Sequence, residues 1–206
     1  MTDDLFRLTW LLDDSKSESA ADGLKMLARK AAQYISDPKA GVFELDTQAI
    51  FVEPVLRGLG WDTLNPYQVD RAPRGAYVDV ELWVPHRDAS KRVAIIEVKK
   101  LSRAEEWQHV RVRGQSAYEQ LKEYALSLLT VDSRSLAAPN STPTLCGVAT
   151  NGACWVVYDF DRSVERLLPS EHQAICEFDV GSPNAPALVE AIGREPLPQR
   201  LGLLET

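Results

Sequence analysis

Residues 77–99 read YVDVELWVPHRDASKRVAIIEVK, and this stretch decides the fold. Residues 77–84 alternate, with valine and leucine on one side and polar or aromatic residues on the other, which is the pattern of a half-buried strand. The polar segment 85–91 predicts a turn, and residues 92–99 are apolar and rich in β-branched side chains up to a charged end. Because the connection is short, we expect the two strands to pair antiparallel.

Three side chains of this hairpin form a chemically meaningful pattern. Glu97 and Lys99 are two residues apart in a strand and therefore project to the same side. Asp79, on the preceding strand, can lie beside Glu97 in such a hairpin. Two adjacent carboxylates repel each other unless a cation lies between them, and hard oxygen ligands suit Mg²⁺. Lys99 is then placed to position or help deprotonate a water held by that metal, so the set suits phosphodiester hydrolysis.

A second interpretation of the same residues is an ordinary solvated strand face with ion pairs between neighbouring strands. Glu81 also lies on the same side of its strand as Asp79. Spacing alone therefore leaves open both the chemistry and the identity of the carboxylate that faces Glu97.

The remaining sequence predicts helices and strands on either side of this hairpin. Their order indicates an α/β (α+β) fold with a mixed central β-sheet flanked by helices. The expected helices cover residues 17–35, 114–129 and 185–192. A further helix is expected to begin near Asp46 and Thr47, to kink or break at Pro54 and to end at Gly58 and Gly60. The expected strands are 145–150 and 154–160, which the turn Asn151-Gly152 joins, and 174–180.

Length and composition bound the class of protein. The chain has 206 residues, 45% of them hydrophobic, which suits one folded domain, 1–206, and excludes a disordered chain. Three cysteines without a CxxC pair indicate a reducing compartment, and three scattered histidines argue against a zinc site. The sequence shows neither a secretory signal nor an apolar run of ~20 residues, so we expect a cytoplasmic protein with no membrane association.

Several motifs follow one another in a specific order. They are a helix with Glu44 and Pro54, Leu-Gly-Trp-Asp at 59–62, Val-Asp-Val-Glu-Leu at 78–82, Ile-Ile-Glu-Val-Lys at 95–99, Gln120 with Tyr124, and Thr-Asn-Gly at 150–152. Together they resemble the PD-(D/E)xK nuclease superfamily, and specifically the N-terminal nuclease domain of type I restriction enzyme R subunits. The resemblance covers residues 44–159, and Val78 stands where the superfamily name has proline.

This resemblance implies a restriction-endonuclease-like core at 41–160, with a helical extension at 1–40 and a strand and helix extension at 161–206. It implies a Mg²⁺-dependent DNA endonuclease of restriction or anti-phage defence, with Mn²⁺ as a substitute metal. The implied metal ligands are Asp79, Glu97 and the Val98 carbonyl. By the same resemblance, Lys99 orients the attacking water and stabilises charge on the phosphate, and Glu44, preferred over Glu53, holds metal-bound water. Gln120 contacts the substrate backbone or a catalytic side chain. The implied substrate contacts are Tyr124, Lys100 and Arg103.

DNA is the expected partner. The sequence contains no GxxxxGK[ST] phosphate loop, so this chain lacks the ATP-driven motor that type I R subunits couple to their nuclease. A separate motor or specificity subunit, or a second copy of the chain, stays open as a further partner. Two other functions also stay open: a non-catalytic nucleic-acid-binding or assembly module that retains the nuclease fold, and a structural subunit of a defence complex.

The net charge of −7 looks unfavourable for DNA binding, but it is unevenly distributed. Residues 71–113 hold ten basic and six acidic residues, a balance of +4, whereas the rest of the chain holds 13 basic and 24 acidic residues, a balance of −11. We therefore expect weak, salt-sensitive DNA binding that is confined to one face.

Overall fold

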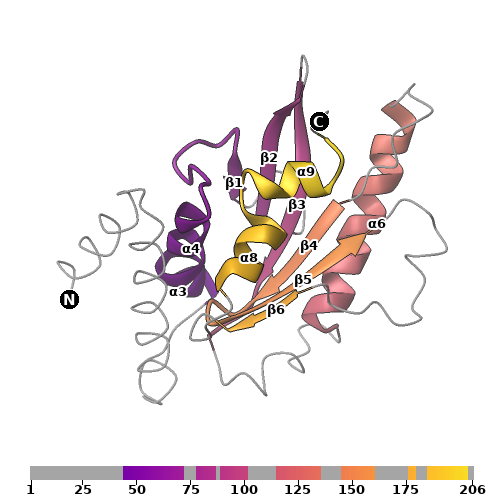
Figure 1. The fold of residues 1–206 in the computed structure, drawn as a ribbon. Coiled ribbons are helices and arrows are strands. Elements are labelled where there is room, and N and C mark those ends of the chain that lie inside the picture. Colours follow the sequence, from indigo (N-terminus) through magenta and orange to yellow (C-terminus); the bar gives the residue numbers. More distant parts are fainter. Residues whose placement is uncertain are drawn as a thin grey trace.

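The structure, a computed structural model, describes residues 44–71, 78–86, 89–101, 115–135, 145–160, 176–179 and 185–203 (Figure 1). Two expectations, the helix at 17–35 within the N-terminal extension and the substrate contact of Arg103, lie outside these residues. No helix within the described ranges is long and apolar enough to cross a membrane.

Within the described residues, the centre of the fold is a mixed sheet whose strands follow one another in sequence order, β1 to β6. β3 and β4 are parallel, and every other neighbouring pair is antiparallel. Helix α6 (Ala117–Ser135) lies between β3 and β4 in the chain, which gives the α/β crossover that a parallel pair needs. The strands are β1 (Val69–Arg71), β2 (Val80–His86), β3 (Ala89–Val98), β4 (Leu145–Thr150), β5 (Cys154–Phe160) and β6 (Cys176–Asp179).

The predicted antiparallel hairpin is confirmed, with different strand limits. β2 begins at Val80, and the strands continue through most of the segment that was expected to form the turn, since Pro85 pairs with Ser90 and His86 with Ala89. The polar side chains of this segment led to the prediction of a turn, but backbone pairing near a hairpin tip does not require apolar side chains. The predicted pair 145–150 and 154–160 is confirmed as β4 and β5.

The helices cover both faces of the sheet (Figure 1). On one face, α4 (Glu53–Gly58), α8 (Ala185–Ile192) and α9 (Pro196–Arg200) pack in a core that includes Phe51, Trp61 and Trp155. On the opposite face, α6 packs against a smaller core that includes Ile95 and Phe160. Both sides of the central strands are therefore buried, which explains why residues 93–96 of β3 and all of β4 except Thr150 are apolar.

The segment around Pro54 is continuous, where the sequence predicts a kink or break. It runs as α3 (Glu44–Thr47), a π-helical stretch at Gln48–Val52 and then α4. The Glu53 N–H donates to the Gln48 carbonyl five residues back. Proline has no N–H to offer the carbonyl four residues before it, and the wider π spacing accommodates this missing donor without ending the helix.

The C-terminal residues complete the first core. The indole Nε1 of Trp61 donates to the Ile192 carbonyl at 2.9 Å, and the Arg194 N–H donates to the Leu59 carbonyl at 3.0 Å. Helix α8 has the limits that the sequence predicts, β6 falls within the predicted 174–180 strand, and α9 was not predicted. The part expected as an extension thus supplies buried side chains to the fold.

Gly147 in β4 is required by the ring of Phe160, which is fully buried on the α6 face. A Cβ added at Gly147 would overlap this ring, with the Cδ2 atom only 2.9 Å away. Tyr118 and Tyr158 lie beside the ring, with centroids 6.4 Å and 6.3 Å from that of Phe160 and 4.9 Å from each other, so the three rings form one aromatic cluster.

Gly147→Ala should therefore lower the free energy of unfolding by about 1–3 kcal/mol, the usual cost of overpacking a core, as measured by chemical denaturation. Adding Phe160→Leu removes the overlapping ring atoms, so the double variant should lose less stability than the sum of the two single losses. Strictly additive losses would contradict the proposed overlap.

Candidate active site

The predicted site lies where β2 begins and β3 ends. The β2–β3 register pairs Val80 with Ile96, and continuing it by one residue brings Asp79 opposite Glu97. The Val98 N–H donates to Asp79 Oδ2 at 2.7 Å. This bond fixes the Asp79 carboxylate at the edge of β3, beside the residue that carries the second carboxylate.

Lys99 joins this carboxylate pair to helix α6. Its ammonium Nζ donates to Glu97 Oε1 at 2.5 Å and to Gln120 Oε1 at 2.8 Å. The amide Nε2 of Gln120 donates in turn to the Gln115 carbonyl at 3.3 Å, which orients the side chain with its oxygen toward the lysine. Glu97 and Lys99 are only 5% and 4% exposed, so these charges interact in a poorly solvated environment.

Burial and mutual repulsion control the protonation of the two carboxyl groups. The pKa of Glu97 is raised to about 7; burial is the largest cause, the Asp79 charge adds to it, and Lys99 opposes it. The pKa of Asp79 is also raised, mainly by burial, against the opposing effects of the Val98 N–H and of Lys99. Glu44 raises the pKa of both groups, which places its charge near the pair.

Glu53, over which the sequence analysis prefers Glu44, is engaged with a residue outside the carboxylate pair. Glu53 forms an ion pair with Arg71, whose Nη2 lies 2.8 Å from Glu53 Oε2 and also donates to the Thr63 carbonyl at 2.8 Å. Glu44 is exposed and acts electrostatically on Asp79 and Glu97.

Glu81, the other candidate for the carboxylate facing Glu97, has a different neighbour. Its carboxylate is 1% exposed and lies 3.0 Å from Arg92 Nε, and the Arg92 guanidinium lies 4.6 Å from the centroid of the Trp83 ring. The contact is an ion pair without hydrogen-bond geometry. The ordinary interpretation, a cross-strand ion pair, thus holds for Glu81 and Arg92 but not for Asp79.

The expected substrate-contact residues are only partly placed at the site. Lys100 is exposed and follows Lys99 directly. Tyr124 is partly buried against the second core, as expected of a tyrosine on the sheet-facing side of α6. Arg71, Arg92 and Lys99 all belong to the basic segment and are engaged in ion pairs, so their charges are less available to DNA than the sequence suggests.

No protein family, curated protein or solved structure matches this chain.

The donor set fits a divalent cation bound by hard oxygens. Glu97 Oε2 is buried and has no hydrogen-bond partner among the described residues, although the other oxygen of the same carboxylate accepts from Lys99. An unpaired buried carboxylate oxygen beside a second carboxylate is costly without a cation or a proton. Among the described residues no three His, Cys, Asp or Glu side chains form a metal-binding group, so a metal here would take two carboxylates, Asp79 and Glu97, with the Val98 carbonyl.

The structure also adds residues that sequence reasoning did not assign to the site. The Thr150 carbonyl accepts the Lys99 N–H at 2.7 Å, and Thr47 Oγ1 accepts the Leu101 N–H at 3.0 Å. Thr150 belongs to the recognised Thr-Asn-Gly motif, but a buried threonine in a helix, such as Thr47, has no distinguishing sequence signal.

Stability should depend on pH through Glu97. Its pKa is higher in the folded state, about 7, than the ordinary value of 4.5, so its contribution to folding is present below pH 4.5 and is lost as the pH rises through 7. Without metal, the free energy of unfolding should fall by at most about 3 kcal/mol between pH 5 and pH 8, as measured by denaturation in EDTA.

Glu97→Gln removes the titrating group and should flatten this dependence. Glu190→Gln, at an exposed position of α8, is the matched control and should keep the wild-type slope. An unchanged slope in Glu97→Gln would show that Glu97 does not titrate in this range.

Proposed function

We propose that this protein is a metal-dependent endonuclease that hydrolyses phosphodiester bonds in DNA. One observation carries the proposal: Lys99 is held 2.5 Å from one oxygen of Glu97, whose other oxygen is buried and unpaired beside Asp79. Two carboxylates and a lysine at one point are the groups that such a hydrolysis needs.

The fold is consistent with this function. A hairpin carries the acidic residues, a helix crosses over to a parallel strand, and a second hairpin completes the sheet. We assign this arrangement to the restriction-endonuclease-like core, as in the nuclease domain of type I restriction enzyme R subunits. In that setting the protein acts in restriction or anti-phage defence, with a separate motor or specificity subunit or a second copy of the chain.

In this mechanism Asp79, Glu97 and the Val98 carbonyl would hold Mg²⁺ or Mn²⁺. The chemistry such an ion would supply is stabilisation of negative charge on the phosphate and activation of water as the nucleophile. Lys99 orients the attacking water and stabilises the charge that develops on the phosphate oxygens. Gln120 fixes the Lys99 side chain through its 2.8 Å bond, and Glu44 receives hydrogen bonds from water on the helix side.

The substrate surface involves the exposed Lys100, next to the site, as a contact for the DNA backbone. Phosphate contacts by lysine or arginine supply sequence-independent affinity that weakens with salt. Since three other basic residues of this segment are engaged in ion pairs, DNA binding by the described residues should be weak.

Asp79→Asn, Glu97→Gln and Lys99→Met should each lower cleavage of supercoiled plasmid in Mn²⁺ by at least about 100-fold, because the first two remove a carboxylate that would hold the metal and the third removes the ammonium that stabilises charge on the phosphate. The controls are Glu190→Gln and Lys122→Met, which remove a carboxylate and an ammonium elsewhere and should cleave like the wild type.

The substrates for this assay are supercoiled plasmid, linear duplex DNA, single-stranded DNA and RNA, with and without Mn²⁺. Wild-type protein that binds DNA but cleaves none of these substrates would contradict the nuclease and support a non-catalytic binding module.

A further inference from the structure

The chain that leaves the site after Lys99 is hydrogen-bonded to two separate elements. The Lys99 N–H donates to the Thr150 carbonyl at the end of β4, at 2.7 Å. Two residues later, the Leu101 N–H donates to Thr47 Oγ1 in α3, at 3.0 Å. The backbone next to the catalytic lysine is thus held between a strand and the helix that carries Glu44.

The position of Thr47 in α3 allows it to hold the backbone that follows Lys99. Its side chain is fully buried, whereas Glu44, three residues earlier, is exposed. Residues three apart in a helix lie on the same side, so the side that bonds to Leu101 also carries Glu44. The bond to Leu101 therefore fixes the helix that carries Glu44 relative to the backbone that follows Lys99.

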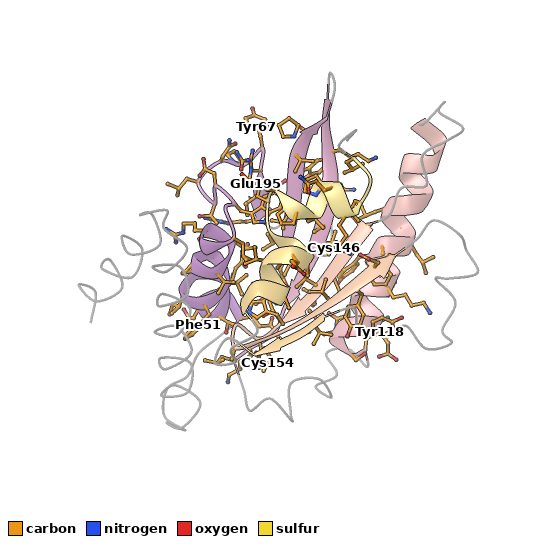
Figure 2. All side chains as sticks on the ribbon, in the orientation of Figure 1. Phe51, Tyr67, Tyr118, Cys146, Cys154 and Glu195 are labelled. Carbon is orange, nitrogen blue, oxygen red and sulfur yellow. The ribbon has the colours of Figure 1, made fainter. Side chains whose placement is uncertain are left out.

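The turn between β4 and β5 supports the same helix from another direction. Gly152, with a φ of +85°, lies so close to the helix that an added Cβ would be 2.7 Å from Phe51 Cβ and 3.2 Å from Thr47 Cγ2. Phe51 and Cys154, the residue at which the turn re-enters the sheet, lie at the same end of the molecule (Figure 2). Glycine is thus required here both for its conformation and for the close approach.

The turn itself is well fixed by its own side chains. Thr150 Oγ1 donates to the Cys154 carbonyl at 2.8 Å and accepts the Gly152 N–H at 2.9 Å. Asn151 Oδ1 accepts the N–H groups of Ala153 and Cys154, at 3.1 Å and 2.7 Å. One bonded turn therefore holds the Lys99 backbone through Thr150 and supports the Glu44 helix through Gly152.

We infer that Thr47 and Gly152 are positioning residues of the carboxylate site: they fix the helix that carries Glu44 against the backbone that follows Glu97 and Lys99, and the affinity of the site for a divalent cation depends on this placement. Neither residue supplies a metal ligand. The inference rests on the metal site of the proposed function and adds the two contacts that set its geometry.

The test measures Mn²⁺ binding by isothermal titration calorimetry with the purified 206-residue chain and no DNA. Thr47→Val keeps the shape but leaves the Leu101 N–H without its acceptor, and the dissociation constant for Mn²⁺ should rise about tenfold, the lower end of the usual effect of residues that orient ligands. Thr47→Ser keeps the hydroxyl and should stay close to the wild type.

Thr63→Val is the matched control. Thr63 is also buried, but its hydroxyl has no hydrogen-bond partner among the described residues, so its removal should leave Mn²⁺ affinity unchanged. Loss of affinity in Thr63→Val equal to that in Thr47→Val would indicate general destabilisation and overturn the inference.

A double-mutant cycle with Glu44→Gln separates positioning from a structural role. If Thr47 acts through Glu44, Thr47→Val should weaken Mn²⁺ binding much less in the Glu44→Gln background than in the wild type. The same fold-change in both backgrounds would overturn the inference.

A comparison of Gly152→Ala with Gly202→Ala tests the contact between Gly152 and the helix. This comparison can overturn the inference even if Thr47→Val does not fold. Gly152→Ala and Gly202→Ala both place alanine at a positive φ, +85° and +67°, but only at Gly152 does the new Cβ meet other atoms. Gly152→Ala should therefore weaken Mn²⁺ binding and Gly202→Ala should not.

The outcomes distinguish this inference from the proposed function. Wild-type protein that binds no Mn²⁺ would contradict the metal-dependent nuclease itself. If the wild type, Thr47→Val and Gly152→Ala all bind Mn²⁺ with the same affinity, the positioning roles are overturned and the proposed function is not.

Discussion

Two neighbouring carboxylates, those of the buried Glu97 and the half-buried Asp79, set the constraint on which the rest of this structure depends. Asp79 is held at the edge of β3 by the Val98 N–H, so it cannot move away to relieve its repulsion of Glu97. Lys99 compensates only one oxygen of Glu97. A site with this unbalanced charge favours a proton or a cation, and we interpret it as prepared for a divalent metal.

The surrounding fold holds these groups in place through backbone contacts. The hairpin register brings Asp79 opposite Glu97, α6 supplies Gln120 to the lysine, and the end of β4 holds the Lys99 backbone. Each of these elements is packed on an apolar core, so the polar site lies at the end of strands whose remaining residues are buried. The geometry of the site therefore depends on core packing as much as on its own hydrogen bonds.

The sequence predicts the hairpin because strand alternation and a short connection leave few alternatives, but spacing alone leaves open whether Asp79 or Glu81 faces Glu97. It does not predict the π-helical stretch before Pro54, the contact of Gly152 with the helix, or the bond from Leu101 to Thr47. These features depend on which elements pack together, and that information is not contained in local patterns. The sequence likewise does not show that Glu81 pairs with Arg92 and is therefore not part of the site.

The central claim is that the half-buried Asp79 and the buried Glu97 form a mutually repelling pair that a divalent cation stabilises. The most direct measurement is a ¹³C NMR titration of the Glu97 carboxyl group, first in EDTA and then in saturating Mg²⁺. The account predicts a pKa of about 7 without metal and a markedly lower pKa with Mg²⁺, because the cation favours the charged form. A pKa near 4.5 that does not respond to Mg²⁺ would contradict it.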